Sequence, residues 1–76
     1  MKELVEKVVS ALADHPDRLR VSELDGATVI VAEVRCHPDD YGRIIGKGGK
    51  TIGALRTLAN AIAQRTSRRA WVEVVQ

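Results

Sequence analysis

One cysteine, two prolines and no phenylalanine occur in this chain of 76 residues, and none of its apolar stretches is long. Cys36 has no partner for an intramolecular disulfide, which agrees with a reducing compartment. The longest uninterrupted apolar run, from Val29 to Ala32, falls far short of the roughly 18 residues that span a bilayer, and nothing resembles a signal peptide. We therefore expect a cytoplasmic protein.

The chain is also too short for most enzymes. A domain of this size buries only about 60% of its unfolded surface, so we expect one globular domain over residues 1–76 with little space for an enclosed active site. No nucleophile and base stand at a recognisable spacing, and we expect no catalysis. His15, Cys36 and His37 are scattered metal-ligand candidates without a fourth ligand, so neither a metal nor another cofactor is expected.

Charge is unevenly distributed, although the net value is only +2. Residues 1–34 contain four basic and seven acidic side chains, whereas residues 35–69 contain eight basic and two acidic ones. This asymmetry is consistent with a second half that meets a polyanion. An ordinary solvated surface explains it equally well.

Hydrophobic periodicity and turn residues predict six elements in the order α-β-β-α-α-β. Pro16 ends the first helix, and Asp25-Gly26 favours a tight hairpin turn with positive φ angles. Pro38 suits the first position of a helix, where Asp39 and Asp40 complement the dipole; we prefer this interpretation to a paired-carboxylate site. The predicted ranges are a helix over 4–12, strands over 18–24 and 28–36, a helix over 38–45, a helix from 50 to about 66 or 67, and a strand over 70–75.

The same periodicity predicts which side chains are buried. On the second strand one face is the better core candidate, and there Cys36 is expected as a small buried hydrophobe rather than a reactive thiol. Tyr41, Ile44 and Ile45 form a helical stripe of the kind that is usually core. The strand residues expected in the core are Ile30, Ala32, Val34 and Cys36, and those of the long helix are Ile52, Leu55, Leu58, Ala59, Ile62 and Ala63.

Three glycines lie within residues 46–49, between the two central helices, with Lys47 and Lys50 among them. Glycine lets a ligand approach the backbone, and the amides at the following helix start attract anions, so the loop suits phosphate. A tight helix-loop-helix corner accounts for Gly46 but not for the lysines. The Walker A spacing fails because Ile44 stands where it needs glycine, and the dinucleotide fingerprint fails at Thr51.

The stretch Ile45-Gly46-Lys47-Gly48-Gly49-Lys50-Thr51-Ile52 resembles the Ile-Gly-x-x-Gly-x-x-Ile signature of KH domains, and the element order resembles their type II arrangement. The likeness covers essentially the whole chain and is greatest to the KhpA-like group of small bacterial RNA-binding proteins. It implies an α+β fold, with helices on one face of a three-stranded mixed sheet. It also implies a loop that clamps the backbone of about four nucleotides of single-stranded RNA.

Carried onto this sequence, the clamp comprises Gly46, Lys47, Gly48 and Gly49. Arg43 and Lys50 are the expected electrostatic contacts, and Ile45 and Ile52 form or support an apolar groove for bases. With Tyr41 and Trp71 as the only aromatics, a sheet platform with rows of stacked bases is not available. We expect weak, sequence-tolerant and salt-sensitive binding, of RNA by the resemblance and possible also with DNA.

Two questions stay open. The apolar groove or a sheet edge could dock another chain, either a second copy or another KH-containing protein, with nucleic acid as a secondary ligand. Arg65, Arg68 and Arg69 cluster after the long helix, where cations complement the helix dipole or extend the contact with RNA or a partner.

Overall fold

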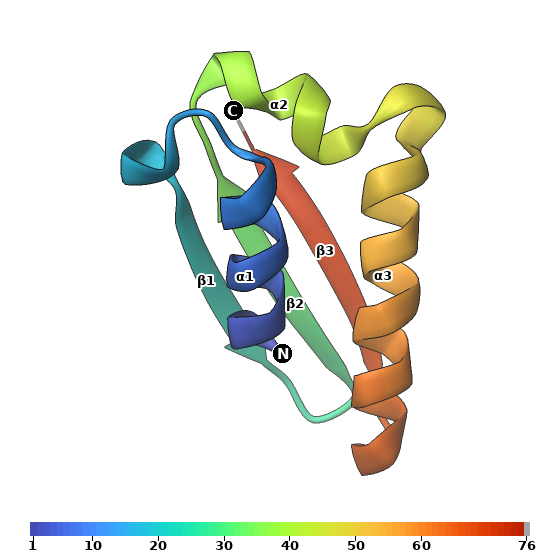
Figure 1. Cartoon of the computed structure of the whole chain (residues 1–76). Helices are drawn as coiled ribbons and strands as arrows, with labels where there is room; N and C mark the ends of the chain where they lie inside the picture. The colour runs from blue at the N-terminus through green and yellow to red at the C-terminus, as the bar shows by residue number, and fades with distance from the viewer. Residues whose placement is uncertain (76) are drawn as a thin grey trace.

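The computed structural model describes residues 1–75, in which three α-helices and three strands follow in the predicted order (Figure 1). Short 3₁₀ turns occupy residues 16–18, 47–49 and 64–66. The α+β class and the α-β-β-α-α-β arrangement are thus confirmed. The elements are α1 (Lys2–Leu12), β1 (Arg20–Asp25), β2 (Val29–Arg35), α2 (Pro38–Ile45), α3 (Lys50–Ala63) and β3 (Arg69–Val75).

The three strands form one mixed sheet in the order β1-β2-β3. β1 pairs antiparallel with β2, and β2 pairs parallel with β3. The parallel pair needs a crossover, which α2 and α3 supply on the same side of the sheet as α1 (Figure 1). Because the helices cover one face of the sheet, burial alternates along β2, and Ile30, Ala32 and Val34 are the side chains buried beneath the helices.

The hairpin between β1 and β2 differs from the prediction. β1 begins at Arg20 rather than residue 18 because Pro16–Arg18 form a 3₁₀ turn. The predicted positive φ angles at Asp25-Gly26 are wrong: among residues 1–75, only Gly46, Gly48, Gly49 and Ser67 have positive φ. Gly26 instead donates its amide to the Val29 carbonyl at 2.9 Å, and an added Cβ would lie 2.8 Å from that oxygen. Close approach, rather than a left-handed turn, requires glycine there.

Side chains from all three helices and all three strands build one hydrophobic core. Cys36 belongs to it, and burial raises the pKa of its thiol, with the nearby Asp40 charge adding to that effect. The buried hydrophobic residues are Val5, Val9, Val21, Ile30, Ala32, Val34, Cys36, Ile44, Ile52, Leu55, Ala59, Ala63, Ala70, Val72 and Val74. Tyr41 and Ile45 are partly buried against them, as their stripe with Ile44 predicted.

Helix α3 packs along β3, and more of its apolar surface is exposed than the sequence predicted. The Arg56 Nε donates to the Val72 carbonyl at 3.0 Å, and the Asn60 side chain accepts from the Ala70 amide at 2.8 Å. The expectation that Leu58 and Ile62 are buried is wrong, because they are 52% and 42% exposed. Both side chains therefore leave apolar surface of α3 uncovered. In the described part of the chain, no helix combines the length and the apolar character needed to cross a membrane.

Candidate functional site

Residues 46–49, the glycine corner, join α2 to α3 in a conformation that requires glycine. Gly46 has φ 80° and ψ 164°, a region essentially restricted to glycine, and its amide caps α2 by donating to the Gly42 carbonyl at 2.9 Å. Gly48 and Gly49 are left-handed, with φ of 64° and 77°. An added Cβ at Gly46 would collide with Thr51, whereas those at Gly48 and Gly49 would enter open space. The outer surface of the corner is therefore bare backbone.

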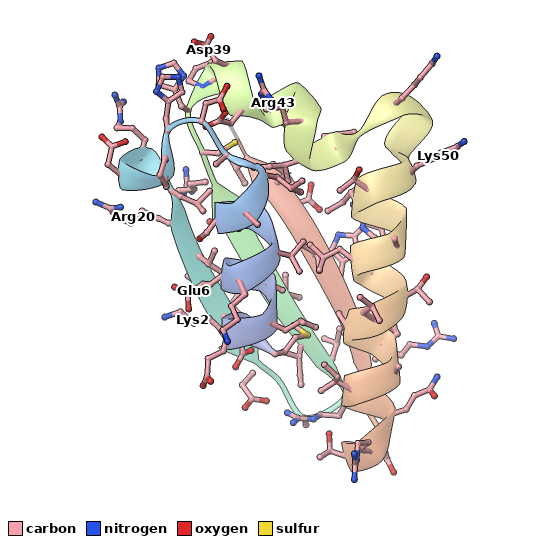
Figure 2. All side chains as sticks on the ribbon, viewed as in Figure 1. Lys2, Glu6, Arg20, Asp39, Arg43 and Lys50 are labelled. Carbon is pink, nitrogen blue, oxygen red and sulfur yellow. The ribbon has the colours of Figure 1, made fainter. Side chains whose placement is uncertain are left out.

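The corner presents its amides and cations to solvent. No side chain caps the N-terminus of α3. Backbone carbonyls do accept two amides there, because Gly49 donates to Gly46 and Lys50 donates to Lys47. Lys47 and Gly48 are exposed, and Lys50 points away from the protein at the start of α3 (Figure 2). From Tyr41 to Val72 the sequence contains seven basic side chains and no acidic one. The exposed backbone at Lys47 and Gly48, with two neighbouring ammonium groups, makes a surface suited to an anion.

The other predicted contact residues, Arg43, Ile45 and Ile52, are next to this corner in the sequence and differ in their surroundings. Arg43 forms an ion pair with Asp14 at 2.8 Å, so its guanidinium already has an anionic partner. Ile45 is half-buried beside the corner, whereas Ile52 is buried in the core. Of the eight predicted site residues, Ile52 is buried, three are half-buried and four are exposed, with Arg43 already paired among the exposed ones.

The C-terminal arginines do not form one surface. Arg68 is held by the hairpin, where it pairs with the Asp25 carboxylate and donates to the Gly26 carbonyl at 3.2 Å. Arg65 follows α3 in a 3₁₀ turn, and Arg69 is the first residue of β3. Both are exposed. Arg68 thus has a structural role, joining the β1–β2 loop to the start of β3.

Asp40 is a buried carboxylate that local sequence reasoning assigned only to a helix start. It is completely buried and accepts the amides of Asp14 and His15 at 2.9 and 3.0 Å. Burial alone would raise its pKa, but these two hydrogen bonds and the positive charge of Arg43 outweigh burial, so the pKa lies below its ordinary value. Asp40 therefore fixes the end of α1 to α2. Its partners are about 25 residues away, and no local signal could have revealed them.

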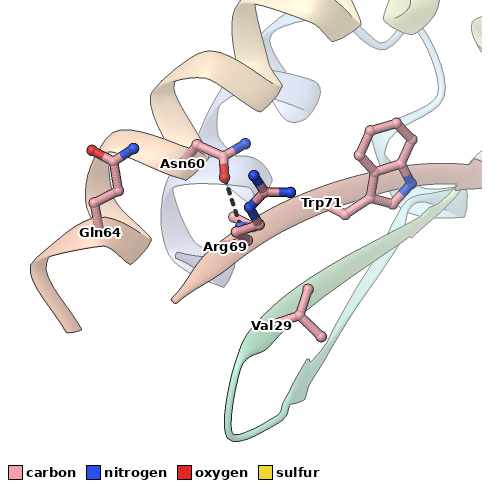
Figure 3. Close-up of a pocket in the computed structure, with 6 residues that line it drawn as sticks. Val29, Asn60, Gln64, Arg69 and Trp71 are labelled. Atoms are coloured by element: carbon pink, nitrogen blue, oxygen red, sulfur yellow. Dashed lines mark hydrogen bonds between the residues drawn. The ribbon is translucent and has the colours of Figure 1, made fainter. Parts of the chain in front are cut away.

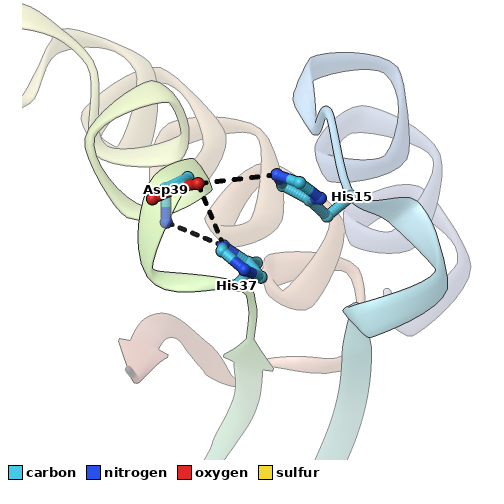
Figure 4. Close-up of side chains that lie close together, drawn as sticks. All are labelled: His15, His37 and Asp39. Atoms are coloured by element: carbon cyan, nitrogen blue, oxygen red, sulfur yellow. Dashed lines mark hydrogen bonds and ion pairs between the residues drawn. The ribbon is translucent and has the colours of Figure 1, made fainter.

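His15, His37 and Asp39, which are separated in the sequence, meet at the start of α2 (Figure 4). The Asp39 carboxylate lies 3.7 Å from His15 Nε2 and 3.6 Å from His37 Nδ1. The imidazoles are stacked, with centroids 4.1 Å apart and planes 23° apart, so their ring nitrogens lie in two separate, nearly parallel planes. His37 Nδ1 also accepts the Asp39 amide at 3.0 Å. In this arrangement the cluster caps α2.

Comparisons with known proteins agree with the signature in the glycine corner. The family model "KhpA/KhpB, KH domain" matches residues 2–74. The chain is 45% identical to the RNA-binding protein KhpA of Halalkalibacterium halodurans over 99% of both chains. It is 47% identical to that of Leifsonia xyli over 90% of this chain and 87% of the relative, and 36% identical to that of Aquifex aeolicus over 100% and 96%. No solved structure matches the chain.

Proposed function

Because the chain belongs to the KhpA/KhpB family of KH domains, we propose that it binds single-stranded RNA through the glycine corner without catalysing a reaction. Lys47 and Lys50 contact phosphates, and the backbone of Lys47 and Gly48 lies against the sugar-phosphate backbone, since the amides of Gly46 and Gly49 already donate to carbonyls of the protein. Bases enter the apolar groove beside Ile45, which Ile52 supports from the core. Arg43 joins the contact only by releasing Asp14.

The observation that carries this proposal is the conformation of the glycine corner. Two left-handed glycines lie at this corner, Gly48 exposed and Gly49 half-buried, with two exposed lysines and a helix start that no side chain caps. The sequence from residue 41 to residue 72 contains no acidic residue. Only a few phosphates fit against so short a segment. We therefore expect a dissociation constant of about micromolar order. The binding constant should fall only gently with salt, because each phosphate contact adds about −0.7 to the slope of log K against log salt concentration for a single strand.

The direct test is the double variant Lys47→Asp, Gly48→Asp, titrated with single-stranded RNA and matched DNA. Asp tolerates the left-handed conformation of Gly48, and its side chain meets open space, so the variant should fold. We expect RNA affinity to fall at least tenfold, roughly the loss of one hydrogen bond to a charged group.

A matched control carries the same change in charge on the exposed side of α1: Lys7→Asp, Ser10→Asp. It should bind RNA nearly as the parent does, which separates local contact from net charge. Circular dichroism reports whether each variant folds. Parental affinity in the folded corner variant would show that the glycine corner is not the RNA-binding site.

A second function, self-association, is supported by the exposed side of α3. Leu58 and Ile62 lie one helical turn apart, and the small side chains of Ala54 and Ala61 beside them permit close helix packing. We propose that this side packs against the same side of a second copy, as a two-fold interface requires. Each dimer would then present two glycine corners and gain avidity for one RNA strand.

Charge gives this association a distinctive salt dependence. Lys50 and Arg65 lie near the two ends of the exposed side, and no acidic residue lies between them, so cations of the two copies meet in either helix orientation. Salt should therefore strengthen self-association while it weakens RNA binding. Sedimentation of the parent and of Leu58→Glu tests this. A parent that stays monomeric at high concentration and high salt would exclude the interface.

A further inference from the structure

A hollow of about 450 Å³ opens far from the glycine corner, between the last turns of α3 and the first residues of β2 and β3 (Figure 3). It is lined by Val29, Asn60, Gln64, Arg69, Ala70 and Trp71. Asn60 and Gln64 follow Lys50 by 10 and 14 residues, which at 1.5 Å per residue places them about 15–21 Å along the helix. The hollow is thus a separate feature from the loop.

Trp71 stands in this hollow as an exposed but fixed aromatic ring. The side chain is 44% exposed. The Arg56 guanidinium lies 3.7 Å from the ring centroid and is itself held by the hydrogen bond from its Nε to the Val72 carbonyl. The indole N–H donates to the Glu73 carboxylate at 2.7 Å. Because these contacts position the ring in advance, a ligand that stacks on it loses little entropy in ordering it.

The hollow combines the groups that recognise a nucleotide. An aromatic ring offers a stacking surface for a base, the exposed Gln64 amide can donate and accept at a base edge, and the exposed Arg69 can pair with a phosphate. Arg56, on the indole, adds a second positive charge. The six lining residues include no carboxylate, although Glu73 accepts the indole N–H at the edge of the ring. Asn60 is already engaged with the Ala70 amide and the Arg56 carbonyl, so it shapes the wall.

One side of α3 connects the glycine corner to this hollow. Lys50, Gly53, Thr57, Asn60 and Gln64 recur at intervals of three and four residues and therefore lie along the same side. Gly53 has no neighbour within 4 Å of an added Cβ, so the path beside it is open. A strand held at the corner can follow this side of the helix without meeting a bulky side chain.

We propose that the hollow is a second nucleotide subsite, in which a base of the same single strand stacks on Trp71 and the adjoining phosphate pairs with Arg69; this rests on the proposed function. The glycine corner holds about four nucleotides, so only a longer strand reaches the hollow. The subsite lengthens the contact along RNA and leaves the clamp unchanged.

Trp71 is the only tryptophan, so its fluorescence reports on the subsite directly. RNA strands of about four and about ten nucleotides are titrated into the parent, Trp71→Leu and Trp71→Phe, since the clamp alone spans about four. We expect the longer strand alone to quench the fluorescence of the parent. Its affinity should fall about fivefold or more in Trp71→Leu, while Trp71→Phe, which keeps an aromatic ring, retains most of it. The short strand should bind all three alike.

The corner variant Lys47→Asp, Gly48→Asp separates the two proposals. If it loses both strands, while Trp71→Leu binds the longer strand as tightly as the parent and the parent's fluorescence does not change, the second subsite is excluded and the clamp stands. If the folded corner variant binds both strands normally, the clamp itself fails and the subsite with it. If Trp71→Leu changes sedimentation but not RNA affinity, the hollow is a protein contact and the nucleotide proposal is wrong.

Discussion

Alanine at Gly46 and alanine at Gly48 should differ sharply in their effect on stability, although the two positions are only two residues apart. At Gly48 the backbone is left-handed, which costs an L-residue about 1–2 kcal/mol, and the added methyl group meets open space. Restricting the unfolded chain returns about 0.4–1 kcal/mol. We therefore expect Gly48→Ala to lower the free energy of unfolding by about 1 kcal/mol.

At Gly46 two penalties combine. Its φ and ψ fall in a region that costs other residues about 1–3 kcal/mol. In addition, the new Cβ would lie 2.7 Å from Thr51 Cβ and 2.8 Å from the Thr51 amide nitrogen, where atoms normally stay about 3.5–4.0 Å apart. Rotating the Thr51 side chain cannot relieve the contact with its backbone, so the first turn of α3 must move. We expect a loss of at least about 3 kcal/mol.

Urea denaturation followed by Trp71 fluorescence measures both effects. With a slope of about 1 kcal/mol per molar urea for a small domain, the midpoint should fall by about 1 M for Gly48→Ala and by about 3 M for Gly46→Ala. Gly48→Ala should also keep most of its RNA affinity. Equal midpoints for the two variants would refute the assignment of Gly46 to close packing and of Gly48 to the open surface.

Three further substitutions, at two positions, probe other parts of the structure. Because the pKa of Asp40 is lowered on folding, its contribution to stability is complete above the ordinary value of 3.8 and is lost as the pH falls through the lower folded pKa. Asp40→Asn should thus melt well below the parent at neutral pH, and the gap in Tm should close in strong acid; a constant gap would contradict this. Gly53→Ala should raise Tm by about 4–8 °C, as removal of a helix glycine worth up to about 1 kcal/mol implies, without changing RNA affinity. Gly53→Glu, which places a carboxylate on the path along α3, should weaken binding of the longer strand several-fold, measured by the same titration.

The fold could be predicted because its determinants are local. Pro16 and Pro38 mark helix boundaries, and alternation along 30–36 identifies the buried face of β2, so each element follows from a few neighbouring residues. The glycine corner was predictable for the same reason, since three glycines within four residues indicate unusual backbone angles.

What the sequence did not reveal depends on how elements pack. Periodicity places Leu58 and Ile62 on the apolar stripe of α3, but it cannot tell that the helix lies along β3 and leaves that part uncovered. Similarly, the bonds of Asp40 to the loop after α1 join residues about 25 positions apart. The setting of Trp71 likewise depends on packing, because Arg56, which lies on its indole, comes from another element 15 residues earlier in the sequence.

The proposals for RNA binding and for self-association both involve α3, and they use different sides of this helix. Ile52, Leu55 and Ala59 face the core, whereas Leu58 and Ile62 lie on an exposed apolar side. The path from Lys50 through Gly53 to Gln64 runs along a third side, next to β3. Since successive residues turn by about 100°, Leu58 and Ile62 lie well around the helix from Gly53 and Gln64, whereas Lys50 borders both sides. A dimer could therefore hold two strands, or one strand twice, and weak contacts at each corner and hollow would add up through avidity.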